Sequence, residues 1–281
     1  MTTSSEERAL EGRTLIISGG SRGIGAAIAV RAARQGANIA LIAKTTESHP
    51  KLPGTIFTAA AAIEDGGGQA LPIVGDIRDD DTVGAAVART VEQFGGIDVN
   101  NASALDLTPT EHISMKKYDL MQDINARGAF LLTKTAIPHL RRSPNAHVLT
   151  MSPPIDLDPK WFSGIGVAYT ISKFSMSLVT IGLAAELRAD GIAVNSLWPR
   201  TTIATAAVRN ILSEKLISRS RTPEIVADAA MSIITKPAGS ATGQCLIDDE
   251  VLAREGVCDV SGYQAVPGGH NLELDFWMAW T

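Results

Sequence analysis

A tyrosine and a lysine stand four residues apart in a stretch of helical periodicity, residues 168–188. The pair is Tyr169 and Lys173. Residues at positions i and i+4 of a helix share one face, so the two side chains come within reach of each other. A phenol titrates near pH 10, and a neighbouring ammonium lowers its pKa, which suits the tyrosine to proton transfer near neutral pH. The alternative is a surface pair that stabilises the helix slightly.

A glycine-rich turn near the N-terminus is the second feature with recognisable chemistry. The apolar run 14–18 leads directly into residues 19–25, which open an alanine-rich helix over residues 24–35. Glycines permit a tight turn and the close approach of a pyrophosphate, and a helix N-terminus offers free N–H groups and the positive end of its dipole. This context favours a dinucleotide site over the alternative, a plain tight turn.

The end of the second apolar run indicates which dinucleotide would bind. NAD sites usually place an acidic residue there for the ribose hydroxyls, whereas this run ends in Ala43 and Lys44 and meets no acid before Glu47. Lys44 and Arg22 would attract a 2′-phosphate, and an arginine at the positive end of a helix is unfavourable without an anion. A solvated Arg22 is the alternative. These residues favour NADP(H) over NAD(H).

These groups require a scaffold that brings distant segments together, and the sequence has a suitable alternation. Short apolar runs alternate with longer helical stretches, which implies a mainly parallel sheet covered on both faces. The runs are residues 14–18, 38–43, 71–74, 97–99, 147–151, 192–197 and 245–247. We predict an α/β fold: one doubly wound (Rossmann) domain over residues 1–281, with a parallel seven-stranded sheet and helices on both faces. Irregular insertions are expected at 46–55, 153–166 and 200–222, an N-terminal tail at about 1–10 and a C-terminal extension at about 250–281.

Composition narrows the function classes. The 281 residues include 25 Lys plus Arg and 30 Asp plus Glu, and the net charge of −5 argues against a general nucleic-acid or anionic-membrane binder. Cys245 and Cys258 form no metal-binding pair, and the five histidines lack metal-ligand spacing, so no metal site is expected. We find no secretory signal and no apolar run of about 18 residues, so we expect a cytoplasmic protein that does not span a membrane.

Three motifs in a fixed order resemble the short-chain dehydrogenase/reductase family over essentially the whole chain. They are the glycine turn, the tripeptide Asn100-Asn101-Ala102 and the Tyr169–Lys173 pair. Segments 43–45, 49–56, 152–154 and 193–199 are similar to the hydroxysteroid-dehydrogenase-like branch. The resemblance implies an oxidoreductase that transfers hydride between NADP(H) and a small carbonyl or alcohol substrate. It also implies a homodimer or homotetramer.

The resemblance implies a role for each matching residue. Tyr169 would exchange a proton with the substrate oxygen, and Lys173 would hold the nicotinamide ribose and lower the tyrosine pKa. Ser152 would hydrogen-bond the carbonyl oxygen, and Asn125 would hold a water that links Lys173 to solvent. The pyrophosphate would be held by Gly19, Gly20, Ser21, Arg22, Gly23, Ile24 and Gly25. Lys44 and Asp76 would contact the adenosine, with Ile77 beside them, and Asn100 would line the cofactor cleft. Ile203 and Thr205 would cover the nicotinamide amide.

Each role has a structural alternative. Ser152 could simply end a strand, and it lies seventeen residues before Tyr169, more than the dozen or so usual in the family. Asn125 could bind local backbone within a helix. Asp76 could cap the next helix, as could Asp79 or Asp80.

The chain departs from the family pattern at three places. Only one residue separates Asp98 from Asn100, two fewer than usual, which would shift side chains or draw the strand into the sheet. Arg200 stands where a glycine follows the proline of the family pattern, and Asp249 and Glu250 replace glycines after the last strand. The C-terminal tail that follows has no family motif.

These residues do not determine which substrate binds or whether the protein catalyses a reaction. The loop with Trp161 and Phe162 and the segment 200–222 either wall an apolar pocket or pack in the core. An apolar pocket would suit a lipid-like, steroid-like or acyl substrate. The rival to an enzyme is a regulatory module that binds a dinucleotide without turnover, because a fold does not guarantee activity. A nucleotide-sugar epimerase is disfavoured because the chain is short for an added substrate domain.

Overall fold

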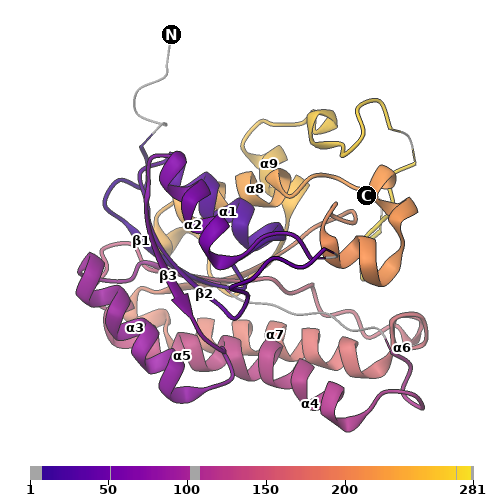
Figure 1. Cartoon of the computed structure of the whole chain (residues 1–281), viewed down its shortest axis with the longest axis horizontal. Helices are drawn as coiled ribbons and strands as arrows, with labels where there is room; N and C mark the ends of the chain where they lie inside the picture. Colours follow the sequence, from indigo (N-terminus) through magenta and orange to yellow (C-terminus); the bar gives the residue numbers. More distant parts are fainter. Residues whose placement is uncertain (1–7, 51, 102–107, 270, 280–281) are drawn as a thin grey trace.

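The computed structural model describes residues 8–50, 52–101, 108–269 and 271–279, without the side chains of residues 99–101 and 211. Within these ranges, seven parallel strands form one sheet in the order β3-β2-β1-β4-β5-β6-β7 (Figure 1). The strands are β1 (Thr14–Ser18), β2 (Asn38–Ala43), β3 (Gln69–Val74), β4 (Val99–Asn101), β5 (His147–Thr150), β6 (Ala193–Trp198) and β7 (Cys245–Ile247). The chain winds outward from β1 to β3 and returns to β4 beside β1. Sheets of this kind bind ligands at the carboxyl ends of the strands, at such a change of direction.

Helices cover both faces of the sheet, as the alternation predicts. They are α1 (Gly23–Arg34), α2 (Ile56–Asp65), α3 (Asp80–Phe94), α4 (Met115–Gln122), α5 (Gly128–Leu140), α6 (Pro159–Ile165), α7 (Val167–Glu186), α8 (Glu224–Ile234) and α9 (Asp248–Arg254). Figure 1 shows α1, α2, α8 and α9 on one face and α3, α5 and α7 on the other. Two apolar clusters, one on each side of the sheet, form the main core. The doubly wound α/β fold is therefore confirmed.

Three strands near the centre of the sheet are buried along their whole length. Every residue of β1, β5 and β6 is buried, as expected for parallel strands that are covered on both faces. The ends differ from the predictions in four strands. Strand β3 begins at Gln69, two residues earlier, and β4 occupies residues 99–101 rather than 97–99. Strand β5 ends at Thr150, one residue earlier, and β6 occupies residues 193–198 rather than 192–197. The insertion at 153–166 contains the short helix α6.

The shortened fourth strand is accommodated at its carboxyl end. Asp98 is fixed at the start: its backbone N–H donates to the Thr14 carbonyl (2.8 Å), and its carboxylate accepts from the Thr14 N–H (2.8 Å). The register then places Asn100 level with Ile16 of β1, whereas β1 continues to Ser18. A parallel strand advances about 3.3 Å per residue. The backbone of Asn100 therefore lies two residues before the level of Ser18, where β1 ends and the glycine turn begins. Ala102 lies outside the described residues.

Helix α7 corrects one expectation from the sequence. By length and composition alone it is apolar enough to cross a membrane, although we expected no such run. Its most apolar window is 61% buried inside the protein, and the helix packs against β5 and β6. A helix that is buried against a sheet passes the same test. The apolar composition of α7 therefore follows from its packing against β5 and β6.

Candidate active site

A cavity of about 340 Å³ opens at the carboxyl edge of the sheet, where the glycine turn and α7 meet. Four parts of the chain form most of its wall: the turn after β1, helix α7, the segment after β6 and the C-terminal segment. Leu52 and Met151 add to it from the segments that follow β2 and β5. The residues that line it include Ser18, Gly19, Arg22, Gly23, Ile24, Gly25, Met151, Tyr169, Lys173, Trp198, Ile203, Thr205, Val208, Leu212, Asp275 and Phe276. The structure thus brings both sequence motifs to one hollow.

The glycine turn has the geometry of a phosphate cradle. Gly19 and Gly23 have φ values of 70° and 58°, which favour glycine. A Cβ on Gly25 would lie 2.9 Å from the carbonyl oxygen of Gly19, so the start of α1 can approach the turn only without a side chain. Within the described residues, no side chain caps the first N–H groups of α1, and the buried Nε of Arg22 has no partner. These unpaired donors fit a diphosphate.

Tyr169 and Lys173 lie inside the protein rather than on its surface. They are 4% and 1% exposed, so the surface-pair alternative is wrong. The Lys173 ammonium donates to the Met151 carbonyl (2.8 Å) and lies 5.0 Å from the centre of the Trp198 ring. The Tyr169 ring packs against Phe276, with ring centroids 6.3 Å apart.

The electrostatics of this pair differ from the expectation. Burial raises the pKa of Tyr169 well above its usual value, and the carboxylate of Asp275 acts in the same direction. Burial also lowers the pKa of Lys173 to about 7, while Asp275 opposes that change. The net direction for Tyr169 is upward, and the effect expected of Lys173 on the tyrosine pKa stays a prediction. The physical reason for the two shifts is that desolvation disfavours the charged form of both groups.

Ser152 lies away from the cavity. It is fully buried, and its hydroxyl is 3.3 Å from that of Thr150, which in turn is 2.6 Å from the hydroxyl of Thr180. Met151, the preceding residue, lines the cavity, whereas Ser152 is absent from the described lining. The role of the Ser152 hydroxyl toward a substrate oxygen stays a prediction.

Asn125 occupies an irregular turn between α4 and α5. Residues Asp123–Arg127 form a π-helical turn, a feature that often marks functional sites. Asn125 is fully buried, and its amide donates to the Ser172 hydroxyl (3.0 Å), which donates to the Tyr169 carbonyl (2.8 Å). The turn thus ties Asn125 to the part of α7 that bears Tyr169 and Lys173. Its role toward a water stays a prediction.

The two residues expected to contact the adenosine, Lys44 and Asp76, meet just after the carboxyl ends of β2 and β3. The ammonium of Lys44 lies 3.0 Å from the Asp76 carboxylate, which also pairs with Arg78 (2.6 Å). Hydrogen bonds from Arg78 hold the pKa of Asp76 well below its usual range. Asp76 does not cap α3, since the side chain of Asp79 does so. Ile77 is buried in the core.

The cavity lining includes some of the residues predicted at the site and not others. Ile203 and Thr205 line the cavity, together with residues 206–208 from the same segment. Trp161 and Phe162 instead pack against an apolar cluster, and the Trp161 ring donates to Asp156 (2.6 Å). The core-packing alternative therefore describes the loop of Trp161 and Phe162. Among the described lining residues we find none of Gly20, Ser21, Lys44, Asp76, Ile77 and Asn125, and the side chain of Asn100 lies outside the described part of the chain.

The comparisons with known proteins agree with this geometry. The family model for short chain dehydrogenases matches residues 13–216. The chain belongs to the short-chain dehydrogenase family. It is 51% identical over 271 residues to hydroxysteroid dehydrogenase-like protein 2 of Xenopus tropicalis, covering 96% of this chain but 64% of that protein. A short-chain dehydrogenase structure from Mycobacterium thermoresistibile shares 54% identity and a TM-score of 0.89, with 96% of each chain covered.

A more distant solved structure has the same fold. A short-chain dehydrogenase from Mycobacterium paratuberculosis, solved bound to NAD, has a TM-score of 0.71 and 22% identity, covering 85% of this chain and 97% of its own. At that identity the likeness concerns the fold. Short-chain dehydrogenases are oxidoreductases that bind a nicotinamide dinucleotide and act on small molecules.

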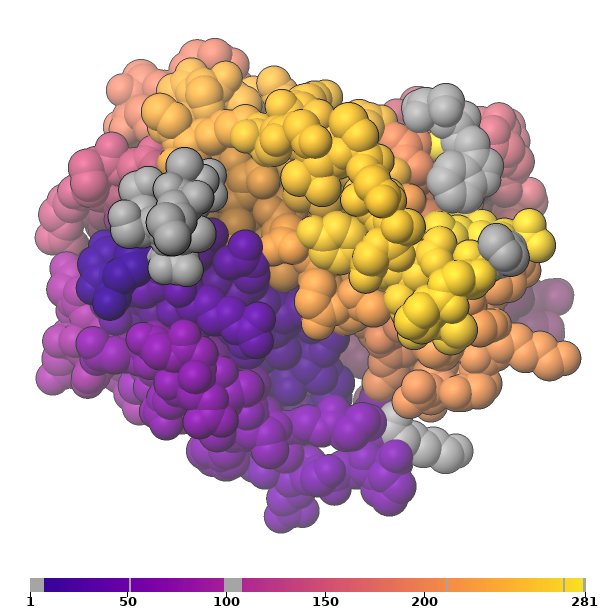
Figure 2. Space-filling model, turned by 90° about the horizontal axis from the view of Figure 1, so that it is seen from above, coloured from indigo at the N-terminus to yellow at the C-terminus, as the bar shows by residue number. Residues whose placement is uncertain are grey.

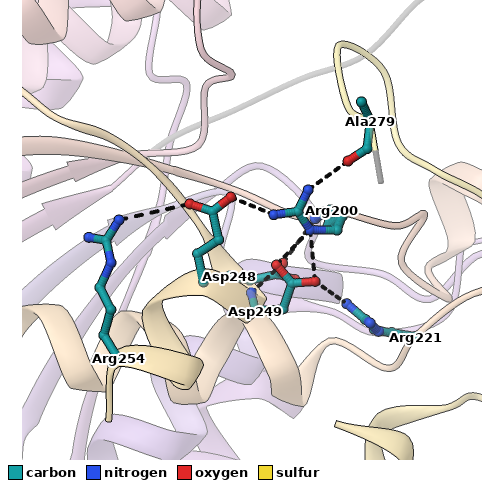
Figure 3. Close-up of polar contacts among 7 residues, drawn as sticks. Arg200, Arg221, Asp248, Asp249, Arg254 and Ala279 are labelled. Carbon is teal, nitrogen blue, oxygen red and sulfur yellow. Dashed lines mark hydrogen bonds and ion pairs between the residues drawn. The ribbon is translucent and has the colours of Figure 1, made fainter. Parts of the chain in front are cut away.

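Two departures from the short-chain dehydrogenase pattern meet in space. The guanidinium of Arg200 pairs with Asp249 (2.8 Å) and Glu250 (2.5 Å), and it donates to the Ala279 carbonyl (2.7 Å) (Figure 3). Arg221 adds a contact to Asp249 (3.1 Å). Sequence reasoning noted these charged residues separately but missed their pairing. A cation and two anions at positions where glycines are expected are the signal that could have revealed it.

Proposed function

We propose that this chain is an NADP(H)-dependent oxidoreductase that transfers hydride between nicotinamide and the carbonyl or hydroxyl carbon of an apolar small molecule. The observation that supports this most directly is the single cavity lined by the glycine turn and by Tyr169 and Lys173. A phosphate cradle and a proton-transfer pair on one hollow would place the two halves of the reaction side by side.

The chain's own residues would bind, orient and move a proton. The dinucleotide, when bound, supplies or accepts the hydride. The N-terminus of α1 would hold its diphosphate. Lys173 would hold the nicotinamide ribose, and the Tyr169 hydroxyl would give its proton to the substrate oxygen during reduction.

The preference for NADP(H) follows from charge at the end of β2. Lys44 follows the last residue of β2, and no acid stands there before Glu47. Lys44 and Arg22 would pair with a 2′-phosphate. The bonds from Arg78 to Asp76 leave Lys44 able to exchange its partner for a phosphate.

The walls of the cavity support an apolar substrate. Beside the catalytic pair, the lining is formed by Met151, Trp198, Val208, Leu212 and Phe276. A largely apolar lining with few polar groups is typical of a small-molecule site. A lipid-like, steroid-like or acyl carbonyl compound would match this lining.

A panel of aldehydes and ketones with NADPH and with NADH tests the proposal. We expect wild-type protein to oxidise NADPH in preference to NADH. Tyr169→Phe should lower kcat at least about a hundredfold, the usual contribution of a general acid, with little change in NADPH affinity. Tyr118→Phe, on α4 and outside the described cavity lining, is the matched control. Equal NADPH consumption by wild type and Tyr169→Phe would contradict the role given to Tyr169.

A binding module without turnover is the second candidate. Two observations favour it: the Ser152 hydroxyl lies in the interior, and the Asn100 backbone stops short of the glycine turn. Such a module would bind NADPH in calorimetry and convert no member of the panel. Turnover that depends on Tyr169 would exclude it.

A further inference from the structure

The C-terminal segment 271–279 crosses the segment that follows β6. The Thr202 N–H donates to the Glu273 carbonyl (2.9 Å), and the Asp275 N–H donates to the Arg200 carbonyl (2.9 Å). An antiparallel bridge between Thr201 and Leu274 lies between these bonds. Figure 2 shows the C-terminal residues, in yellow, packed against the orange surface formed after β6. The segment is therefore held by backbone pairing as well as by side chains.

Arg200 fixes the end of this segment to α9. Its side chain is only 5% exposed, and its donors reach Asp249, Glu250 and the carbonyl of Ala279 (Figure 3). Removing one member of a buried ion pair leaves an uncompensated charge, which is strongly destabilising. The positions that distinguish this chain from its family pattern thus secure the C-terminal segment beside the cavity.

This segment brings an ionisable group to the active site. Asp275 and Phe276 line the same cavity as Tyr169 and Lys173. The Asp275 carboxylate accepts from the backbone N–H of Phe276 (2.7 Å), which fixes its direction. Trp277, which follows Phe276, packs its ring against that of Tyr169, with the two ring centroids 5.8 Å apart. The carboxylate is therefore held at the cavity wall rather than left free in solvent.

Given the proposed reductase function, on which this inference rests, we propose that Asp275 is a positioning residue of the site. Its carboxylate stabilises the charge on Lys173 and opposes ionisation of Tyr169, so that the tyrosine stays protonated for carbonyl reduction. In that reaction the substrate carbon gains hydride from NADPH, and its oxygen gains the Tyr169 proton, which leaves a phenolate and NADP⁺. A protonated tyrosine beside a charged lysine is the state that can start this transfer.

The charges around Asp275 define what its removal would change. Tyr169 and Lys173 face it from α7, and Asp248 acts on it from the start of α9. Arg200 contacts its backbone, and Arg22 lines the same cavity. Burial raises the pKa of Asp275 to about 7, the charge of Asp248 acts in the same direction, and Lys173 opposes both. Above that pH the carboxylate is charged and acts on both α7 residues.

Tyrosine titration tests the inference without a substrate. The chain has only three tyrosines, so the tyrosinate absorbance of each protein minus that of its Tyr169→Phe counterpart isolates Tyr169. We expect Asp275→Asn to ionise Tyr169 at lower pH than wild type, because a nearby negative charge is lost. Glu273→Gln is the matched control, since it removes a carboxylate from the same segment that pairs with Arg219 outside the described cavity lining. An unchanged Tyr169 titration in Asp275→Asn overturns the proposal.

Turnover provides the second measurement. Without Asp275, Lys173 loses its charge and Tyr169 its proton at lower pH, so the alkaline limb of the reduction profile should move to lower pH. At alkaline pH we expect kcat to fall roughly tenfold, which corresponds to about 1.4 kcal/mol, with little change in KM. Asp275→Glu should restore part of the profile, and Asp275→Ala should behave like Asp275→Asn. A uniform loss at every pH would indicate a merely structural role and overturn the proposal.

The two hypotheses fail in different ways. If wild-type protein converts no substrate, the proposed function fails, while the Tyr169 titration still decides the effect of Asp275. If wild type is active and Asp275→Asn leaves both the titration and the pH profile unchanged, only the role of Asp275 fails.

Discussion

At the scale of single residues, burial controls the protonation of several groups. His147 at the start of β5 is buried; its Nε2 donates to the Lys236 carbonyl (3.0 Å). The buried Nδ1 has no partner in the part of the chain that the structure describes. Burial, reinforced by the charge of Arg13, lowers the pKa of His147 to about 4. Protonation would place a second N–H where nothing accepts it.

This histidine predicts a loss of stability in acid. The unfolded pKa of about 6.5 lies above the folded value, so the unfolded state binds more protons between these two values. The contribution of His147 is complete above pH 6.5 and is lost as pH falls through about 4. The full effect is on the order of 3 kcal/mol. Urea unfolding at several pH values should show a shallower acid loss for His147→Gln than for wild type, with exposed His112→Gln as control. Parallel curves would contradict the prediction.

At the scale of elements, the glycine turn shows how backbone packing prepares a binding site. Gly25 lies in the first turn of α1, and its missing side chain lets the helix approach Gly19. Gly23 and Gly25, in this first turn, both line the cavity. Gly84 in α3 is different, because nothing described lies within 4 Å of a Cβ added there.

These two glycines predict opposite responses to alanine. Gly25→Ala should displace α1 from the turn, lower stability by about 1–3 kcal/mol and weaken NADPH binding. Gly84→Ala should raise stability by about 0.5–1 kcal/mol, because alanine favours a helix interior, and leave binding unchanged. Denaturant unfolding and NADPH titration measure both effects. Tight NADPH binding by Gly25→Ala would refute the proposed cradle.

At the scale of the whole molecule, one apolar helix face is left open to solvent. Val167, Ile171, Leu178 and Ile181 are exposed on α7, and Phe130 is exposed on α5. Their spacing on α7 follows one face of a helix. Exposed apolar surface that is continuous in this way indicates an interface. We propose that this face joins copies of the chain into the homodimer or homotetramer expected from the sequence.

A charge on this face should therefore dissociate the assembly. Leu178 is 60% exposed, so Leu178→Glu would bury a carboxylate only in an oligomer. Light scattering should report an oligomer for wild type and a monomer for Leu178→Glu. Leu157→Glu changes a side chain that is 71% exposed in the loop before α6, and it should leave the mass unchanged. A wild-type monomer would refute the interface.

Local sequence patterns determined much of this protein. The apolar runs determined the strands and the doubly wound fold, because a parallel sheet buries its strands on both faces. Glycine spacing determined the turn, and the i, i+4 rule placed Tyr169 and Lys173 on one face of α7. These features depend on residues that are close in the chain, so their patterns are readable without coordinates.

Tertiary structure alone decided the surroundings of these residues. It placed Ser152 outside the described cavity lining, buried Tyr169 so that its pKa rises, and joined Arg200 to charges about fifty residues later. It also placed Asp275 in the same cavity lining as Lys173, which precedes it by about a hundred residues. Burial and long-range electrostatics depend on which distant segments come into contact, and local sequence periodicity does not show which segments do so.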